Sequence, residues 1–137
     1  MIPLLVYETT TAAVRAEYDE DPSLMVWWGT EVECVSALAR LERDGSFTRA
    51  AMKQALERLA ALRGSWHELQ PAETIRREAI RILRVHDLLA ANALQLSAAL
   101  AAAEGVPASL DFFSLDGRLS RAADREGLRL VELPRAV

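Results

Sequence analysis

Cysteine and long apolar runs are scarce in this chain. Cys34 is the single cysteine among 137 residues, so no internal disulfide can form. The chain has no charged leader with an apolar centre and no uninterrupted apolar stretch of about 18 residues, the features of an export signal and of a membrane-spanning helix. The sequence therefore predicts a cytoplasmic location and no membrane partner.

Motifs of several common enzyme classes are also missing. There is no phosphate-binding glycine loop, no dinucleotide-binding glycine fingerprint and no paired-cysteine zinc spacing. His67 and His86 have no serine, cysteine or carboxylate arrangement near them in sequence that would indicate an activated nucleophile. Cys34 falls inside a predicted helix next to Glu33, which favours a core thiol over a catalytic one.

Composition and charge limit the possible organisation. Hydrophobic residues make up 51% of the chain, enough for one compact core at this length. No internal repeat, low-complexity tract or long linker divides it, so residues 1–137 are predicted to form a single domain. The net charge of -4 argues against broad phosphate neutralisation, but a local basic strip remains compatible with RNA binding.

Apolar spacing and turn residues predict alternating helices and strands. The expected helices are 11–20, 30–44, 48–64, 72–85, 88–103 and 116–126. The expected strands are 24–28, 66–69, 110–115 and 128–133. This alternation is typical of an α/β fold in which a parallel sheet has helices on its faces.

Two acidic residues follow predicted strands. Glu33 lies near the start of the helix after 24–28, and Asp116 directly follows 110–115. Functional side chains gather beyond the carboxyl ends of parallel strands, so these two carboxylates are candidates to converge. Clustered carboxylates suit Mg²⁺ or Mn²⁺, because hard cations prefer oxygen ligands.

The same acids have structural explanations. Thr30 and Glu33 have the spacing of a capping box, and Asp116 is placed to cap the helix that follows it. From the residues alone, capping is favoured for both acids. Asp87, in a predicted turn, and Asp111, in a predicted strand, are interpreted as solvated.

Asn92 introduces an amide into an Ala/Leu-rich helix. It lies three residues after Leu89 and four before Leu96, so the three share a face that is predicted to pack inward. A buried amide must find hydrogen-bond partners there. A buried structural asparagine therefore explains the residue without chemistry.

Three segments together resemble a known family. They are Trp27–Arg40, Leu88–Leu100 around Asn92, and Ser114–Leu119 followed by Ala122-Ala123 and Glu126-Gly127. In this order and spacing they resemble the PIN domain of VapC-type toxins, the ribonucleases of type II toxin–antitoxin systems. The likeness extends over nearly the whole chain.

The resemblance implies a fold, an activity and a site. It implies a three-layer α/β/α fold with a mostly parallel central sheet, and hydrolysis of RNA that depends on Mg²⁺, with Mn²⁺ as a substitute. Glu33 corresponds to the second catalytic acid and Asp116 to the fourth, both as metal ligands. Asn92 occupies the third metal-ligand position, which is normally an acid. The implied partners are an RNA substrate, a VapB-like antitoxin and a second copy of the chain.

The first acid of the family has no counterpart in the chain. Family members begin with a central strand that ends in an Asp-x-Ser-like motif. Glu8 followed by two threonines imitates this motif but leaves too little chain before Glu33 for the usual first helix. In the better register Pro3–Glu8 resembles the end of that helix, which predicts a PIN-like domain truncated at its N-terminus.

Three hypotheses follow. The first is a VapC-type, Mg²⁺-dependent endoribonuclease with an incomplete acid site, in which Asn92 is a degenerate ligand. The second is a non-catalytic PIN-fold module whose apolar helices bind an antitoxin or another PIN protomer. The third is a fragment or decayed toxin without a present function.

Overall fold

The computed structural model describes residue 1 and residues 11–133, which fall into two compact units. Of the described residues, unit 1 contains residue 1, residues 11–67 and residue 133, and unit 2 contains residues 68–132. Each unit has a hydrophobic core of its own. The single domain expected over residues 1–137 stays a prediction, and the helix end expected at Pro3–Glu8 lies outside the described residues.

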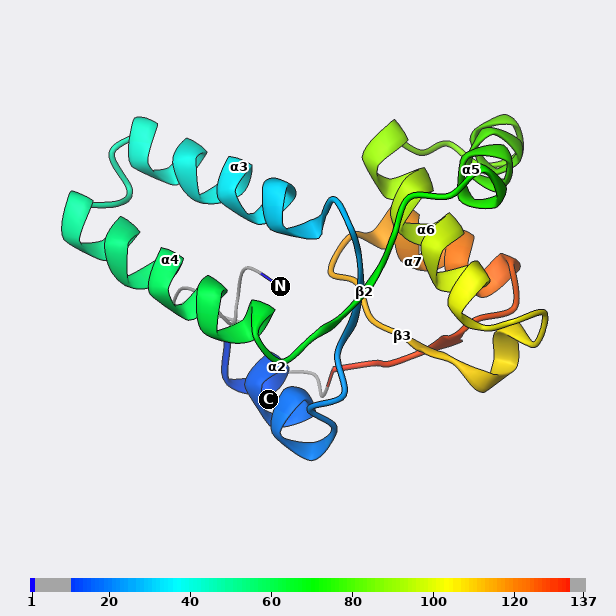
Figure 1. Ribbon diagram of the computed structural model, residues 1–137, viewed down its shortest axis with the longest axis horizontal. Coiled ribbons are helices and arrows are strands. Elements are labelled where there is room, and N and C mark those ends of the chain that lie inside the picture. The colour runs from blue at the N-terminus through cyan, green and yellow to red at the C-terminus, as the bar shows by residue number, and fades with distance from the viewer. Residues whose placement is uncertain (2–10, 134–137) are drawn as a thin grey trace. The chain divides into compact units, whose positions relative to one another are not determined.

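Unit 1 consists of helices with short strands between them (Figure 1). Its elements are α2 (Thr11–Glu20), β1 (Met25–Trp27), α3 (Thr30–Arg43), α4 (Arg49–Arg63) and the first residue of β2 (His67–Leu69). β1 pairs with β2, and the N–H of His67 donates to the carbonyl of Leu24 at 2.8 Å. Thr48 caps α4, since its side chain accepts a hydrogen bond from the Ala51 N–H at 3.1 Å.

The core of unit 1 includes the facing sides of α3 and α4, which run side by side (Figure 1). α3 contributes Cys34 and Leu38, and α4 contributes Ala55 and Leu59. Each pair is four residues apart and so lies on one face of its helix. Trp66 joins the same cluster just before β2. Of the apolar residues whose spacing predicted these helices, Leu38 and Leu59 are buried, whereas Val32 and Leu56 are exposed.

The capping box predicted at Thr30 and Glu33 is wrong. Gly29 holds the N-cap position of α3 with φ of -75° and ψ of -6°, and its helix start has no side-chain cap. Because Gly29 already has helical dihedrals, Thr30 lies inside the helix, and the Glu33 N–H donates to the Gly29 carbonyl at 3.0 Å. Thr30 is therefore not the N-cap residue.

Unit 2 combines helices with a small parallel sheet. Its elements after β2 are α5 (Glu73–Val85), α6 (Ala90–Ala102), the 3₁₀-helix η1 (Pro107–Ser109), β3 (Asp111–Phe112), α7 (Gly117–Arg125) and β4 (Arg129–Leu130). β3 and β4 run parallel, with Asp111 opposite Arg129 and Phe112 opposite Leu130. Gly127 has φ of 93°, a conformation that favours glycine, and it turns the chain from α7 towards β4.

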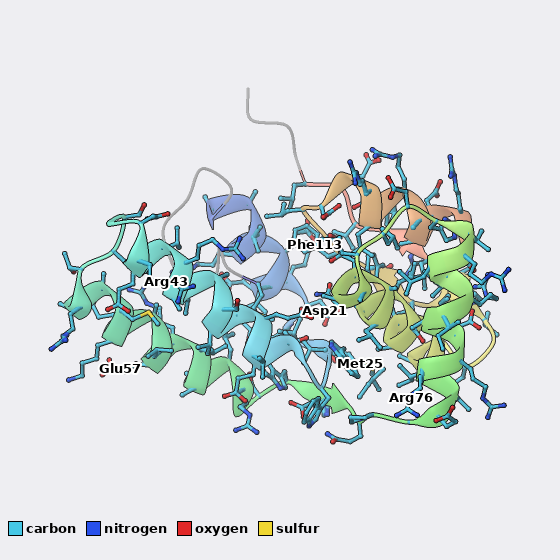
Figure 2. The ribbon with its side chains drawn as sticks, turned by 90° about the horizontal axis from the view of Figure 1, so that it is seen from above. Asp21, Met25, Arg43, Glu57, Arg76 and Phe113 are labelled. Carbon is cyan, nitrogen blue, oxygen red and sulfur yellow. The ribbon has the colours of Figure 1, made fainter. Side chains whose placement is uncertain are left out.

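The core of unit 2 joins α5, α6 and α7. Ile82, Leu96 and Leu119 are almost fully buried in it. The buried hydroxyl of Ser97 donates to the Ile75 carbonyl at 2.6 Å, which connects α6 to α5. The outer side of α5 is charged: Arg76, labelled in Figure 2, forms an exposed ion pair with Glu73 at 2.9 Å.

The α/β class expected from the sequence is confirmed, and every described α-helix lies where a helix was predicted. The 3₁₀-helix η1 was not predicted. The strands are shorter than expected. Of the predicted strand 110–115, for example, Asp111 and Phe112 form the strand that pairs with β4. The described strands form two two-stranded sheets, β1–β2 and β3–β4. Among the described residues no helix is both long and apolar enough to cross a membrane.

Candidate functional site

The most distinctive polar contact in unit 2 joins the starts of two helices. Asn92 lies in the first turn of α6, and Asp116 is the N-cap residue of α7. The Asn92 amide Nδ2 donates to Asp116 Oδ2 at 3.2 Å, although the two residues are 24 positions apart. Two of the three positions singled out by the resemblance therefore meet within one unit.

An open pocket of about 470 Å³ surrounds this contact. Its walls come from the segment leading into α6 and from the first turns of α7. They carry two apolar side chains, one amide, one carboxylate, two guanidinium groups and one glycine: Leu88, Leu89, Asn92, Asp116, Arg118, Arg121 and Gly117. This chemistry can bind a ligand that has both an anionic and an apolar part.

The Asp116 carboxylate is held by backbone groups as well as by Asn92. Its Oδ1 accepts hydrogen bonds from the N–H groups of Arg118 at 2.9 Å and Leu119 at 3.0 Å. The bond from Leu119 is the largest cause that keeps the pKa of Asp116 below its ordinary value; partial burial opposes it, and the Arg118 and Asn92 bonds add to it. The predicted helix cap at Asp116 is confirmed, and the residue also lines the pocket.

Asn92 is not the buried core amide that its helical face predicted. Its side chain is half-buried and lines the pocket, and Leu89 on the same face is 76% exposed. The first fully buried residue of α6 is Ala93, followed by Leu96 one turn later. The start of α6 therefore projects beyond the core, which helical periodicity alone does not reveal.

The two arginines of the pocket differ in their partners. Arg118 Nη1 lies 3.4 Å from Asp87 Oδ2, and both side chains are largely exposed. Asp87 is thus solvated, as predicted. Arg121 forms no hydrogen bond or ion pair within the described part of the chain. Asp111, also predicted to be solvated, is exposed on β3, where it pairs with Arg129.

Glu33, the remaining acid of the resemblance, belongs to unit 1. It is half-buried in the first turn of α3. Its neighbour Cys34 is buried, as expected of a core thiol, and burial raises the pKa of this thiol to about 11. Glu33 thus belongs to unit 1 and Asp116 to unit 2.

The pocket of unit 2 does not fit a divalent cation on its own. Mg²⁺ takes about six oxygen ligands, usually including one or two carboxylates. The pocket offers one carboxylate, and Asn92 turns its amide nitrogen, a donor, towards it. Two guanidinium groups line the same space. Within residues 1 and 11–133 no group of three or more histidine, cysteine, aspartate or glutamate side chains is placed to hold a metal ion.

Sequence reasoning missed a second polar cluster in unit 2. His86 Nε2 lies 2.7 Å from Glu126 Oε1, and Arg81 donates to Glu126 Oε2 at 2.6 Å. Burial alone would raise the pKa of Glu126, but the hydrogen bonds from Arg81 and His86 lower it overall. His86 and Glu126 are 40 positions apart. Their contact depends on how α5 and α7 pack, so no local motif marks it.

Comparisons of the chain with protein-family models, with curated proteins and with solved structures gave no match. The resemblance to VapC-type PIN domains therefore depends on the three sequence segments and their order.

Proposed function

We propose that this chain is a VapC-like PIN-domain protein that engages RNA at the pocket around Asn92 and Asp116. In this proposal its ancestral activity is Mg²⁺-dependent endoribonuclease action, and its acid site is degenerate. The three-layer α/β/α architecture, the cytoplasmic location, the VapB-like antitoxin and the homodimer belong to the same proposal.

One observation carries the proposal. Residues at the third and fourth positions of the PIN pattern, far apart in sequence, lie within hydrogen-bond distance in an open pocket. The same pocket holds Arg118 and Arg121, whose guanidinium groups suit RNA phosphates. This local basic surface answers the objection raised by the net charge of -4.

We describe the acid site as degenerate because the pocket has too few carboxylates to hold a metal ion. Asp116 is the one carboxylate among the pocket residues, and Asn92 is neutral where the pattern calls for an acid. Glu33 is assigned to the second acidic position by the resemblance. Since the pocket residues do not fit the metal, no hydrolytic step is assigned to the chain as it stands.

The decisive substitution restores an acid at the third position of the PIN pattern. Asn92→Asp is expected to tighten Mn²⁺ binding by about tenfold or more over the parent chain, because a charged oxygen ligand replaces a neutral amide. Isothermal calorimetry measures this change, and Asp116→Ala in the Asn92→Asp background should abolish it. Cleavage of a labelled single-stranded RNA with Mn²⁺ is the second readout.

Gln95→Glu is the matched control. It makes the same amide-to-acid change on α6 but at a residue that does not line the pocket. Far-ultraviolet circular dichroism establishes that each variant is folded. If folded Asn92→Asp binds Mn²⁺ no better than the parent or than Gln95→Glu, the assignment of Asn92 to a ligand position is wrong, and with it the degenerate nuclease.

A specific observation favours a second candidate, the non-catalytic interaction module. Ile80 and Leu83, three residues apart on one face of α5, are 54% and 40% exposed. Apolar side chains clustered on a helix surface suit a partner helix, either of an antitoxin or of a second PIN protomer. Dimerisation measured by sedimentation and weakened by Ile80→Glu, but not by Arg77→Glu on the same helix, would support it.

A further inference from the structure

The Asp116 carboxylate has its charge met by N–H groups. Oδ1 accepts two backbone N–H bonds, and Oδ2 accepts the Asn92 amide at 3.2 Å. In a cluster of acids, the charge on such an oxygen would require a cation or a proton nearby. Here an uncharged side chain of the same molecule supplies the donor.

We propose that Asn92 takes the place of a divalent cation at Asp116, so that the pocket is preformed without metal and binds an RNA phosphate through Arg121 and Arg118. The RNA ligand rests on the proposed function. The role of the Asn92 amide rests on its contact with Asp116 and stands independently of the ligand.

The charge balance of the pocket supports an anionic ligand once the amide is in place. One carboxylate faces two guanidinium groups, and that carboxylate is already satisfied by three donors. Arg118 is shared with Asp87 at 3.4 Å, an exposed pair of the kind that contributes little. Arg121 has no hydrogen bond or ion pair within the described residues, so its planar fork is available for a phosphate.

An aspartate at position 92 would reverse this balance. Two carboxylates would then face each other at hydrogen-bond distance, and their repulsion would require a cation between them or nearby. The site would have two negative groups against two positive ones, and phosphate binding would weaken. The amide thus decides whether the pocket depends on a metal.

The shape of the pocket also suits a nucleotide unit. Gly117 lies against the end of the Arg121 side chain: a Cβ at this position would lie 3.3 Å from Arg121 Nη1 and would displace it by a few tenths of an ångström. Leu89 is 76% exposed in the same pocket and offers an apolar surface to a sugar or a base. The pocket of about 470 Å³ can therefore bind a phosphate through its arginines and an apolar sugar or base surface through Leu89.

Thermal unfolding in EDTA tests the role of the amide. Asn92→Asp should lower the melting temperature by on the order of 5 °C, because a favourable contact becomes a repulsive one. Mn²⁺ should restore it. The exchanged pair Asn92→Asp/Asp116→Asn should regain the parent melting temperature in EDTA, since one amide and one acid are present again and asparagine also caps helices. Gln95→Glu controls for added charge on α6.

RNA binding tests the function of the pocket. Fluorescence anisotropy of a labelled single-stranded RNA of about ten nucleotides, at fixed salt, should give the same affinity for the parent in EDTA and in Mg²⁺. Arg121→Gln should weaken binding by about tenfold, while Arg125→Gln, on the same helix outside the pocket lining, should change it by less than about threefold. Asn92→Asp should bind weakly in EDTA and recover with Mn²⁺.

Thermal unfolding and RNA binding test different parts of the inference. If Asn92→Asp melts like the parent in EDTA, the amide does not act as a substitute for a cation. If the folded parent binds no RNA, or binds it only with Mg²⁺, metal-free phosphate recognition is overturned. Absence of RNA binding in every condition also overturns the proposed function, whereas Mg²⁺-dependent binding overturns this inference alone.

Discussion

The two units bury different chemistry. The core of unit 1 combines apolar side chains with the thiol of Cys34. Unit 2 buries the hydroxyl of Ser97 in its core and holds the carboxylate of Glu126, with a side chain only 15% exposed, between Arg81 and His86. Apolar contacts are indifferent to pH, whereas a charged hydrogen-bonded cluster is not.

This difference assigns opposite pH sensitivities to the two units. In unit 1 the buried thiol of Cys34 favours the folded state only while it is protonated, so its contribution to folding stability is lost at alkaline pH. In unit 2 the Glu126 carboxylate is stabilised in its charged form, so its contribution is lost on the acid side. Both units are stabilised by packed helices, and we expect the largest losses of stability from substitutions in that packing.

Truncation of a fully buried leucine should cost the two units about the same. Leu38→Ala in α3 and Leu96→Ala in α6 each remove a side chain that is 0% exposed. Each should lower the free energy of unfolding by about 2–5 kcal/mol, since apolar contact is lost and a cavity remains. Urea titration followed by circular dichroism measures both losses.

Leu56→Ala serves as the control for these truncations. Leu56 lies on α4 and is 38% exposed, so its loss should cost less than about 1 kcal/mol. If Leu38→Ala costs no more than Leu56→Ala, the packing of α3 against α4 is not what stabilises unit 1.

The helices whose cores these truncations probe could be predicted from the sequence, because their signals are local. Apolar residues recur at helical spacing in α3, α4 and α5, and Thr48 and Asp116 mark helix starts by their own side chains. Strand pairing could not be predicted to the same degree. β3 is paired over two residues, and the chemistry of residues 110–115 does not tell which of them find a partner.

Alkylation of Cys34 tests whether its thiol is buried in the core of unit 1. With its pKa raised to about 11, the folded thiol is almost entirely protonated at about pH 8.5, where an unfolded cysteine is half ionised. Iodoacetamide should therefore react about a hundredfold more slowly with the folded chain than with the chain in denaturing urea. Mass spectrometry follows the adduct. Equal rates in the two states would mean that the thiol is accessible and that unit 1 opens at this position.

The same thiol predicts an alkaline loss of stability. The folded pKa lies above the unfolded value, so the stabilising contribution is complete below about pH 8.5 and disappears as the pH rises towards about 11. Cys34→Ser would not isolate this effect because it buries a hydroxyl in an apolar core. Cys34→Ala leaves no titrating group, and its unfolding free energy should be flatter over this range.

Glu126→Gln tests the acid side of the comparison in unit 2. The substitution keeps the shape but removes the charge between Arg81 and His86, and it should cost about 1.5–3 kcal/mol at neutral pH. The pKa of Glu126 is lowered on folding, so the parent should lose this contribution as the pH falls below about 4.3, while the variant should not. Urea titrations across that range compare the two slopes.

Glu132→Gln provides the matched control, because Glu132 is an exposed glutamate of the same unit. It should leave both the neutral stability and the acid slope within about 0.5 kcal/mol of the parent. A Glu126→Gln variant that keeps the parent slope below pH 4.3 would show that other carboxylates carry the acid sensitivity.

The candidate site was only partly predictable, and the reasons differ by residue. The helix cap at Asp116 could be predicted because an aspartate directly precedes the helix that begins at Gly117. Asn92 was placed on the correct helix, but periodicity assigned it to the core, whereas the core of α6 begins at Ala93. Arg121 gave no signal of its own, because an arginine four residues into a helix is normally a solvated side chain. The pocket that gives it a role exists only once α6 and α7 are packed.

The smallest effects are expected from exposed ion pairs, whose coupling energies should be small in both units. Glu31–Arg63 in unit 1 and Glu73–Arg76 in unit 2 are both 2.9 Å pairs with exposed side chains. Water and salt screen such pairs, so a double-mutant cycle with Gln at both positions should give a coupling energy of about 0.2–1 kcal/mol in either unit. The Glu31 pair joins α3 to α4 and has the less exposed carboxylate, at 37%, so its coupling should be the larger of the two. A coupling well above 1 kcal/mol in unit 1 would mean that this unit also depends on charge, and the contrast with unit 2 would then be one of degree.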